Sequence, residues 1–384
     1  MQQALINGRI FTGDEWLSGH ALIVEHGRIL DLRDARHIPS ACIPIDVKGQ
    51  RLLPGLIDTQ VNGGGGVLFN DAPHIATLRT MGKAHFRFGT TGFLPTLISD
   101  EFNVMRQGIQ AVSEAMKQEI PGVLGIHLEG PFLNTERKGV HDASKFRRLD
   151  QDALTLLTSL KQGKTLVTLA PELTTPDKIR ALASAGVIVA AGHTAADYHT
   201  IRQALDAGLS SFTHLFNAMT PMMGREPGVV GAALEDTDSW CGVIADGYHV
   251  HPATLKVAIA AKAPGKMILV TDAMPTVGAE VKEFVLKGET IRAVNGRCAT
   301  ADNTLAGSDL DMLGAVRNSV NDLGLSLEEA LRMASRYPAE MLGLADELGT
   351  LAPGYRASII CIDDDLQLTQ SWIEGERIIH PSNT

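Results

Sequence analysis

Between residues 52 and 275 the chain alternates short apolar runs with stretches that have helical spacing. Eight runs rich in aliphatic residues each end in polar residues, at 53–62, 91–99, 123–130, 164–172, 187–194, 211–218, 240–247 and 267–274. Segments with helical periodicity, such as 74–89 and 197–208, separate them. Near-continuous apolar strands that alternate with helices are typical of a parallel sheet covered on both faces. Eight such units predict an α/β fold, a closed (β/α)8 TIM-like barrel.

The two ends of the chain have a different pattern. Residues 1–51 and 346–384 contain short β-like runs separated by Asn-Gly, His-Gly and Glu-Gly pairs, which favour hairpin turns. Neither end has enough apolar residues to fold alone, so we expect both to pair into one small β-sandwich domain, with the barrel spanning 52–345. A further hairpin is predicted at 283–300, and Ser308 or Asp309 is expected to cap the helix that follows.

Composition narrows the classes of function. The 384-residue chain has a formal net charge of −10, which argues against a nucleic-acid surface. No apolar run reaches the roughly 18 residues of a membrane span, and the N-terminus lacks the pattern of a signal peptide. The four cysteines are far apart and form no CxxC pair: Cys42, Cys241, Cys298 and Cys361. We therefore expect free thiols and a cytoplasmic protein.

Reactive side chains follow several of the predicted strands. Glu129 lies at the end of the third run, His193 of the fifth and Asp272 of the eighth, and His214 lies within the sixth. Each alone has a structural interpretation, because a histidine in a strand is often hydrogen-bonded in the core and a terminal carboxylate often caps a helix. The carboxyl ends of the strands form the active site of a (β/α)8 barrel. We expect all four residues to lie at that rim, and their presence together there favours a catalytic site over four separate structural roles.

The chemistry of this set indicates a metal-dependent hydrolase. Glu129, His193 and His214 supply three ligands and leave a fourth position for water, as in catalytic zinc sites. A metal there lowers the pKa of the water and polarises a carbonyl. Asp272 would carry the proton from that water to the leaving nitrogen of an amide or a related carbonyl compound. We expect zinc, with iron, cobalt and manganese as alternatives.

The chain resembles the amidohydrolase superfamily and, within it, the N-acetylglucosamine-6-phosphate deacetylase family. The resemblance covers essentially the whole length and rests on PGLIDTQVNGGGG, GIHLEGPF, KGVHD, AGHT, THLFNAM, GVIADGYHV and LVTDAM. It implies a barrel with a small β-sandwich built from both termini, and a cytoplasmic homodimer. The implied reaction in amino-sugar catabolism removes acetate from N-acetylglucosamine 6-phosphate and leaves glucosamine 6-phosphate.

The resemblance also implies roles for single residues. By motif, Glu129, His193 and His214 are ligands of one divalent metal ion per subunit, and Asp272 is the general acid/base. His141, from KGVHD, contacts the substrate and helps to polarise the acetyl carbonyl.

Phosphate contacts are implied for a second set of residues. The backbone N–H groups of Asn217 and Ala218 would hold the phosphate, together with His249. Arg225 would reach the phosphate in the neighbouring subunit of the dimer. A guanidinium combined with backbone donors suits a phosphate group.

The first strand departs from the pattern of two-metal amidohydrolases. Alternation places Asp58, Gln60 and Asn62 on one face, and two-metal enzymes carry His-x-His at the last two positions. Amides bind zinc poorly compared with imidazole. We therefore predict that the second metal site is lost, and that Gln60 and Asn62 hydrogen-bond to metal-bound water or to the metal ligands instead.

Two alternatives remain open at this point. The same motifs suit an enzyme for another N-acetyl sugar phosphate, such as N-acetylgalactosamine 6-phosphate, or for a cyclic amide. A non-catalytic scaffold that keeps the barrel is the other alternative, and the replacements at Gln60 and Asn62 are its support. Asp272 argues against a scaffold, because a scaffold does not need a general base at the rim.

Overall fold

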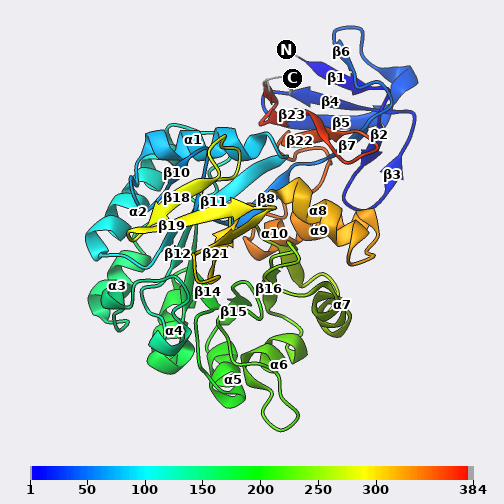
Figure 1. Ribbon diagram of the computed structural model, residues 1–384. Helices are drawn as coiled ribbons and strands as arrows, with labels where there is room; N and C mark the ends of the chain where they lie inside the picture. The colour runs from blue at the N-terminus through cyan, green and yellow to red at the C-terminus, as the bar shows by residue number, and fades with distance from the viewer. Residues whose placement is uncertain (1, 379–384) are drawn as a thin grey trace.

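The computed structural model describes residues 2–378, and an eight-stranded parallel barrel lies at its centre (Figure 1). Neighbouring strands in the barrel follow chain order. The strands are β8 (Leu56–Val61), β11 (Thr90–Ile98), β12 (Gly125–Glu129), β13 (Lys164–Leu169), β14 (Ile188–Ala191), β15 (Leu209–Phe212), β16 (Trp240–Val243) and β17 (Met267–Leu269). Each of the eight predicted runs overlaps one of these strands, so the predicted barrel is confirmed.

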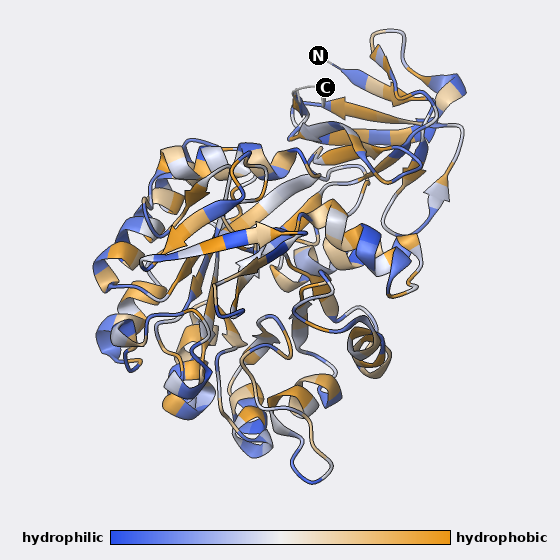
Figure 2. Cartoon of the chain, in the orientation of Figure 1, coloured by the Kyte–Doolittle hydropathy of each residue, from blue (hydrophilic) through white to orange (hydrophobic). Residues whose placement is uncertain are grey.

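Helices surround the barrel and bury apolar residues. They are α1 (Ile75–Phe86), α2 (Phe102–Lys117), α3 (Gln151–Leu157), α4 (Pro176–Ser184), α5 (Tyr198–Asp206), α6 (Gly228–Glu235), α7 (Pro252–Ala261), α8 (Met312–Asn321), α9 (Leu327–Ala334) and α10 (Arg336–Met341). In α2 the buried Met105, Ile109 and Val112 recur at helical spacing, and Figure 2 shows apolar and polar stretches mixed along the outer helices. The predicted helical segments 74–89 and 197–208 contain α1 and α5.

Strands from both ends of the chain form the small β domain, as predicted (Figure 1). One sheet has the order β24 (Glu376–Ile378), β23 (Leu368–Ile373), β22 (Ile359–Ile362), β7 (Arg51–Pro54), β2 (Arg9–Phe11) and β3 (Trp16–Leu17). The other has the order β5 (Arg28–Asp34), β4 (His20–Glu25), β1 (Gln3–Ile6) and β6 (Ile43–Asp46). Their shared core includes Ile10, Leu52, Ile359 and Trp372. The limits predicted for the small domain (1–51 and 346–384) and for the barrel (52–345) stay a prediction. The small domain as predicted includes residues 1 and 379–384, which lie outside the described residues.

A third sheet lies over the carboxyl end of the barrel. It consists of β18 (Glu283–Leu286), β19 (Glu289–Val294), β20 (Arg297–Ala299) and β21 (Leu305–Ser308), so the hairpin predicted at 283–300 is confirmed. The predicted helix cap is wrong. Ser308 is the last residue of β21 and Asp309 follows it, whereas α8 is capped by Asp311, whose carboxylate accepts from the Gly314 N–H at 2.6 Å. Residues 309–311 lie between the end of β21 and the start of α8, so the capping position falls on Asp311 and not on Ser308 or Asp309.

The barrel sheet has two end strands, β8 and β17, and we call the junction between them the seam. The strands meet there through an isolated parallel bridge between Val61 and Ala273. The short hairpin of β9 (Gly63–Gly64) and β10 (Val67–Leu68) follows β8. It is tied to the chain beyond β17, because Gly63 and Gly65 donate backbone hydrogen bonds to the carbonyls of Ala273 and Val277.

All four cysteines are free and buried, which agrees with the expected free thiols. Within residues 2–378, no helix is both long enough and apolar enough to cross a membrane.

Candidate active site at the carboxyl end of the barrel

Glu129, His193 and His214 lie together where β12, β14 and β15 end. The Nε2 atoms of the two histidines are 3.1 Å apart, and they lie 3.2 Å and 3.0 Å from Oε1 of Glu129. All three side chains are buried, and their ligand atoms lie within 4.8 Å of one another. The structure therefore brings together the three residues predicted to bind a metal.

This donor set fits a divalent metal ion. Two imidazole nitrogens and one carboxylate oxygen face the same point, which is the ligand set of catalytic rather than structural sites. The other ring nitrogen of His193 lies 2.7 Å from the carbonyl oxygen of Arg137 and can donate its hydrogen there. That bond leaves the lone pair of Nε2 for a metal. Zinc, iron, cobalt and manganese all accept such ligands.

The two histidines of the metal-binding group and Asp272 have a left-handed backbone. The φ angle is +48° at His193, +32° at His214 and +52° at Asp272. This conformation is unfavourable for residues with a Cβ atom, and it concentrates at functional sites. It occurs just beyond the end of a strand in each case, and all three side chains line the same cavity.

Gln60 and Asn62 connect the metal-binding group to Asp272. Nε2 of Gln60 donates to Oε2 of Glu129 at 3.1 Å and to Oδ1 of Asp272 at 3.2 Å. Nδ2 of Asn62 donates to the same Oδ1 of Asp272 at 2.6 Å. The two amides therefore act as hydrogen-bond donors to carboxylates, and Gln60 directly contacts one of the residues of the metal-binding group.

The two acidic groups of the site have opposite pKa shifts. Burial, strengthened by the charge of Glu129, raises the pKa of Asp272 to about 6. Burial alone would also raise the pKa of Glu129, but the imidazole groups of His193 and His214, whose Nε2 atoms face its carboxylate, hold that pKa well below its usual value. Glu129 is therefore charged at neutral pH, as a metal ligand must be, and Asp272 is suited to exchange a proton near neutrality.

His141 lies beside the metal-binding group. Its Nδ1 atom lies 2.8 Å from Oγ of Ser99, and its Nε2 atom lies 3.9 Å from Oε1 of Glu129. Its ring centroid is 4.4 Å from that of His193. The bond to Ser99 fixes the orientation of the ring, so that Nε2 faces the site.

The residues predicted to hold a phosphate fall into two groups. Asn217, Ala218 and His249 line the same cavity as the metal-binding group, and Nδ1 of His249 lies 2.6 Å from Oδ2 of Asp246. The backbone N–H of Asn217 already donates to the carbonyl of His214 at 3.0 Å. Arg225 does not line this cavity; it lies exposed on the loop that follows.

The cavity has a volume of about 270 Å³ and is partly closed by the third sheet. Thr304, Leu305 and Gly307, from β21 and the turn before it, line it together with Met274. These residues were missed by sequence reasoning, because small and apolar side chains give no catalytic signal. Asp246 was also missed, although a carboxylate three residues before His249 in a turn is a usable signal.

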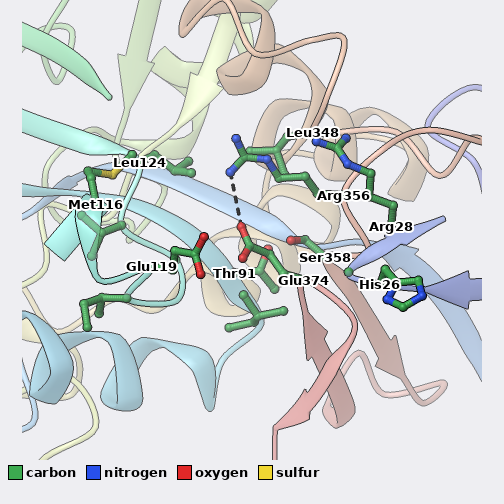
Figure 3. Close-up of a pocket in the computed structure, with 15 residues that line it drawn as sticks. His26, Arg28, Thr91, Met116, Glu119, Leu124, Leu348, Arg356, Ser358 and Glu374 are labelled. Carbon is green, nitrogen blue, oxygen red and sulfur yellow. Dashed lines mark hydrogen bonds and ion pairs between the residues drawn. The ribbon is translucent and has the colours of Figure 1, made fainter. Parts of the chain in front are cut away.

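A second cavity, of about 320 Å³, lies between the small β domain and the barrel (Figure 3). Charged residues from both parts line it, and Nη1 of Arg356 lies 3.4 Å from Oε1 of Glu374. Thr91 and Leu124 line it at the starts of β11 and β12. The active site of a (β/α)8 barrel lies at the other end of the strands, so this cavity is not the candidate active site.

The barrel and its rim define the class of protein: a metal-dependent hydrolase. Residues 51–379 match the amidohydrolase family, and residues 3–52 match the NagA composite domain. The chain therefore belongs to the amidohydrolase family.

Individual relatives carry more specific names. The chain is 43% identical, over 85% of its length and 82% of the relative, to an N-acetylgalactosamine-6-phosphate deacetylase of Shewanella sp. (strain ANA-3). Its structure is similar to the N-acetylglucosamine-6-phosphate deacetylase of Pasteurella multocida, with a TM-score of 0.95, 34% identity, and coverage of 99% of this chain and 100% of that one. A Mycobacterium smegmatis N-acetyl-D-glucosamine-6-phosphate deacetylase in complex with N-acetyl-D-glucosamine-6-phosphate matches with a TM-score of 0.88 and 31% identity, over 99% of both chains.

Proposed function

We propose that the chain hydrolyses the N-acetyl group of an N-acetylhexosamine 6-phosphate and releases acetate and the amino sugar phosphate. The observation that carries this proposal is the buried group of Glu129, His193 and His214 with Asp272 beside it. The class of substrate rests on the names of relatives that share nearly the whole chain. The reaction would belong to amino-sugar catabolism.

The proposed site holds one divalent metal ion per subunit, with zinc as the first candidate and iron, cobalt or manganese as alternatives. When bound, the metal supplies a Lewis acid that activates water and polarises the acetyl carbonyl. Gln60 and Asn62 stand where two-metal enzymes carry histidines, and both donate hydrogen bonds to carboxylates. These contacts support a site with a single metal ion.

Asp272 is proposed as the general acid/base. Gln60 and Asn62 both donate to its Oδ1 atom, so that Oδ2 is the oxygen left to take a proton from water. The same carboxyl group then delivers that proton to the amine nitrogen as the amide bond breaks. His141 would donate a hydrogen bond to the acetyl oxygen, and the contact of its Nδ1 atom with Ser99 supports this role.

The phosphate is proposed to bind at the end of the cavity lined by Ala218 and His249. Arg225 would contribute from the neighbouring subunit of a homodimer, because it does not line the cavity of its own chain. Its loop exposes two large apolar side chains, Met222 (57%) and Met223 (63%). Exposed methionines next to an arginine are typical of a protein interface, which supports this placement.

N-acetylglucosamine 6-phosphate is the first candidate substrate, and the similar Pasteurella and Mycobacterium structures support it. N-acetylgalactosamine 6-phosphate is the second, favoured by the 43% identity to the Shewanella relative. The two sugars differ in the direction of one hydroxyl group.

Acetate release from both sugar phosphates, and from the two unphosphorylated sugars, tests the proposal. We expect rapid release from at least one sugar phosphate, with kcat/KM far lower when the phosphate is missing. A metal-loaded, folded protein that releases acetate from none of them would contradict the proposal and favour another acyl substrate or a scaffold.

A further inference from the structure

Asp58 is a buried carboxylate of β8 that the proposed reaction does not use. It is fully buried, and the groups that contact it are neutral donors. Its Oδ1 atom accepts from the backbone N–H groups of Gln60 at 3.1 Å and of Thr271 at 3.3 Å. Its Oδ2 atom accepts a short hydrogen bond from the hydroxyl of Thr271. Burying a carboxylate is costly unless its hydrogen bonds are satisfied, and here two of the three come from one residue.

Thr271 is the residue directly before Asp272. Asp58 binds both its N–H and its hydroxyl, and Ser308 of β21 donates its hydroxyl hydrogen to the Thr271 carbonyl at 2.5 Å. The Thr271 hydroxyl also accepts from the N–H of Ala273 at 3.2 Å. The peptide group before Asp272 is therefore fixed by the side chain of Ser308, and the one after it by the Thr271 hydroxyl that Asp58 holds.

Asp272 needs this support because of its own backbone. Its φ angle of +52° is left-handed, and such a conformation persists only when the surrounding structure holds it. β21 also approaches closely: a Cβ atom on Gly307 would lie 2.8 Å from the carbonyl oxygen of Asp272. With φ at +62°, Gly307 permits that approach.

The seam explains why a side chain is needed here. Elsewhere in the barrel, neighbouring strands are held by ladders of backbone hydrogen bonds. β8 and β17 share no such ladder: the bridge between Val61 and Ala273 and the backbone hydrogen bonds from Asn62 and Gly63 to the Ala273 carbonyl all lie beyond the end of β17. The bonds from Asp58 to Thr271 cross the same seam.

We propose that Asp58 is a positioning residue: by holding Thr271 across the seam, it keeps the carboxyl group of Asp272 against Asn62 and Gln60. This inference rests on the proposed catalytic role of Asp272, and it adds a residue of β8 that touches neither metal ligands nor cavity. A displacement of about 1 Å at a catalytic group is enough to cost roughly 100-fold in rate.

Three substitutions test the proposal without removing much volume. Thr271→Val deletes the hydroxyl that Asp58 binds, Thr271→Ser keeps it, and Asp58→Asn replaces one acceptor oxygen by a donor. Thr90→Val is the matched control, because the Thr90 hydroxyl is also buried in a barrel strand but has no hydrogen-bond partner within the described residues.

The first readout is the crystal structure of each variant. We expect Asp272 Oδ1 to move out of hydrogen-bond range of Asn62 in Thr271→Val and Asp58→Asn, and to stay at Asn62 in Thr271→Ser and Thr90→Val. An Asp272 that stays against Asn62 in all four variants overturns the proposal, whatever the activity of the enzyme.

The second readout is kcat per bound metal ion. Thr271→Val and Asp58→Asn should lose about 10- to 100-fold in kcat with KM nearly unchanged, and Thr271→Ser should restore most of it. The double variant should lose little more than the worse single variant, because both changes break one interaction. A lower melting temperature with wild-type kcat would instead assign Asp58 a purely structural role. A wild-type protein without deacetylase activity would contradict the proposed function, while the crystallographic distance would still decide this inference.

Discussion

Asn62 donates a hydrogen bond from its side-chain amide to Asp272, with 2.6 Å between Nδ2 and Oδ1. An amide side chain at this position orients a carboxylate, whereas a histidine there would compete to bind a metal. Gln60 donates to the same oxygen. Oδ1 of Asp272 is therefore held by Gln60 of β8 and by Asn62 just after that strand, and Oδ2 is left for the proposed proton transfer. The two amides that replace the histidines of the His-x-His pattern therefore orient the carboxyl group of Asp272.

Asp272→Asn should nearly abolish turnover, because it removes the group that carries the proton. We expect kcat to fall by about 10²- to 10⁴-fold, with metal content and KM close to wild type. Steady-state kinetics on protein of measured metal content checks this. A rate near that of the wild type would remove Asp272 from the mechanism.

Metal analysis should find one tightly bound divalent ion per chain, held by Glu129, His193 and His214. A chelator should abolish activity and lower the melting temperature, since a ligand that binds the folded state stabilises it. Adding zinc should restore both. Two tightly bound ions per active chain would contradict the single-metal site.

Gln60→Leu and Asn62→Leu should have different effects. Gln60 contacts both Glu129 and Asp272, whereas Asn62 contacts Asp272. Gln60→Leu should therefore weaken metal binding by about 10- to 100-fold as well as lowering kcat, and Asn62→Leu should lower kcat while metal affinity stays close to wild type. Metal titration by calorimetry separates the two. Equal losses of metal affinity would show that Gln60 has no special role at Glu129.

Arg225→Ala should raise KM for the phosphorylated sugar far more than for the unphosphorylated one, because it removes a cation from the proposed phosphate site. Steady-state kinetics on both sugars measures the ratio. Equal effects on both would remove Arg225 from that site.

Mixing two variants tests whether Arg225 acts across a dimer interface. A heterodimer of Arg225→Ala and Asp272→Asn chains has one site with an intact base and an intact arginine from the partner. Random mixing should then restore about one quarter of wild-type activity at low substrate concentration. Activity equal to the sum of the separate variants would indicate that Arg225 serves its own subunit or none.

The sequence pattern was sufficient to predict the barrel and the metal-binding group. Eight apolar runs with polar ends determine both the strands and the rim on which Glu129, His193 and His214 meet. Their distances within the site could not be predicted, because they depend on the left-handed backbone at His193, His214 and Asp272. A left-handed backbone at a residue other than glycine cannot be predicted from the identity of that residue.

Other parts of the site depend on contacts between distant segments. Ser308 was expected to cap a helix, but its hydroxyl binds the carbonyl of Thr271, 37 residues earlier in the chain. Asp58 is recognisable in the sequence as an inward residue of the first strand, yet its partner Thr271 is 213 residues away. Local propensity carries no information about such pairs.

The sheet made from both ends of the chain also affects synthesis of the protein. β7 ends at Pro54, and its partner β22 begins at Ile359. At about 5–20 residues per second, a ribosome needs roughly 15–60 s to make the intervening chain. During that time β7 presents an unpaired edge, which is a template for aggregation. The nascent chain therefore completes its barrel before its small domain can close, and a stop codon before β22 would leave that edge permanently open.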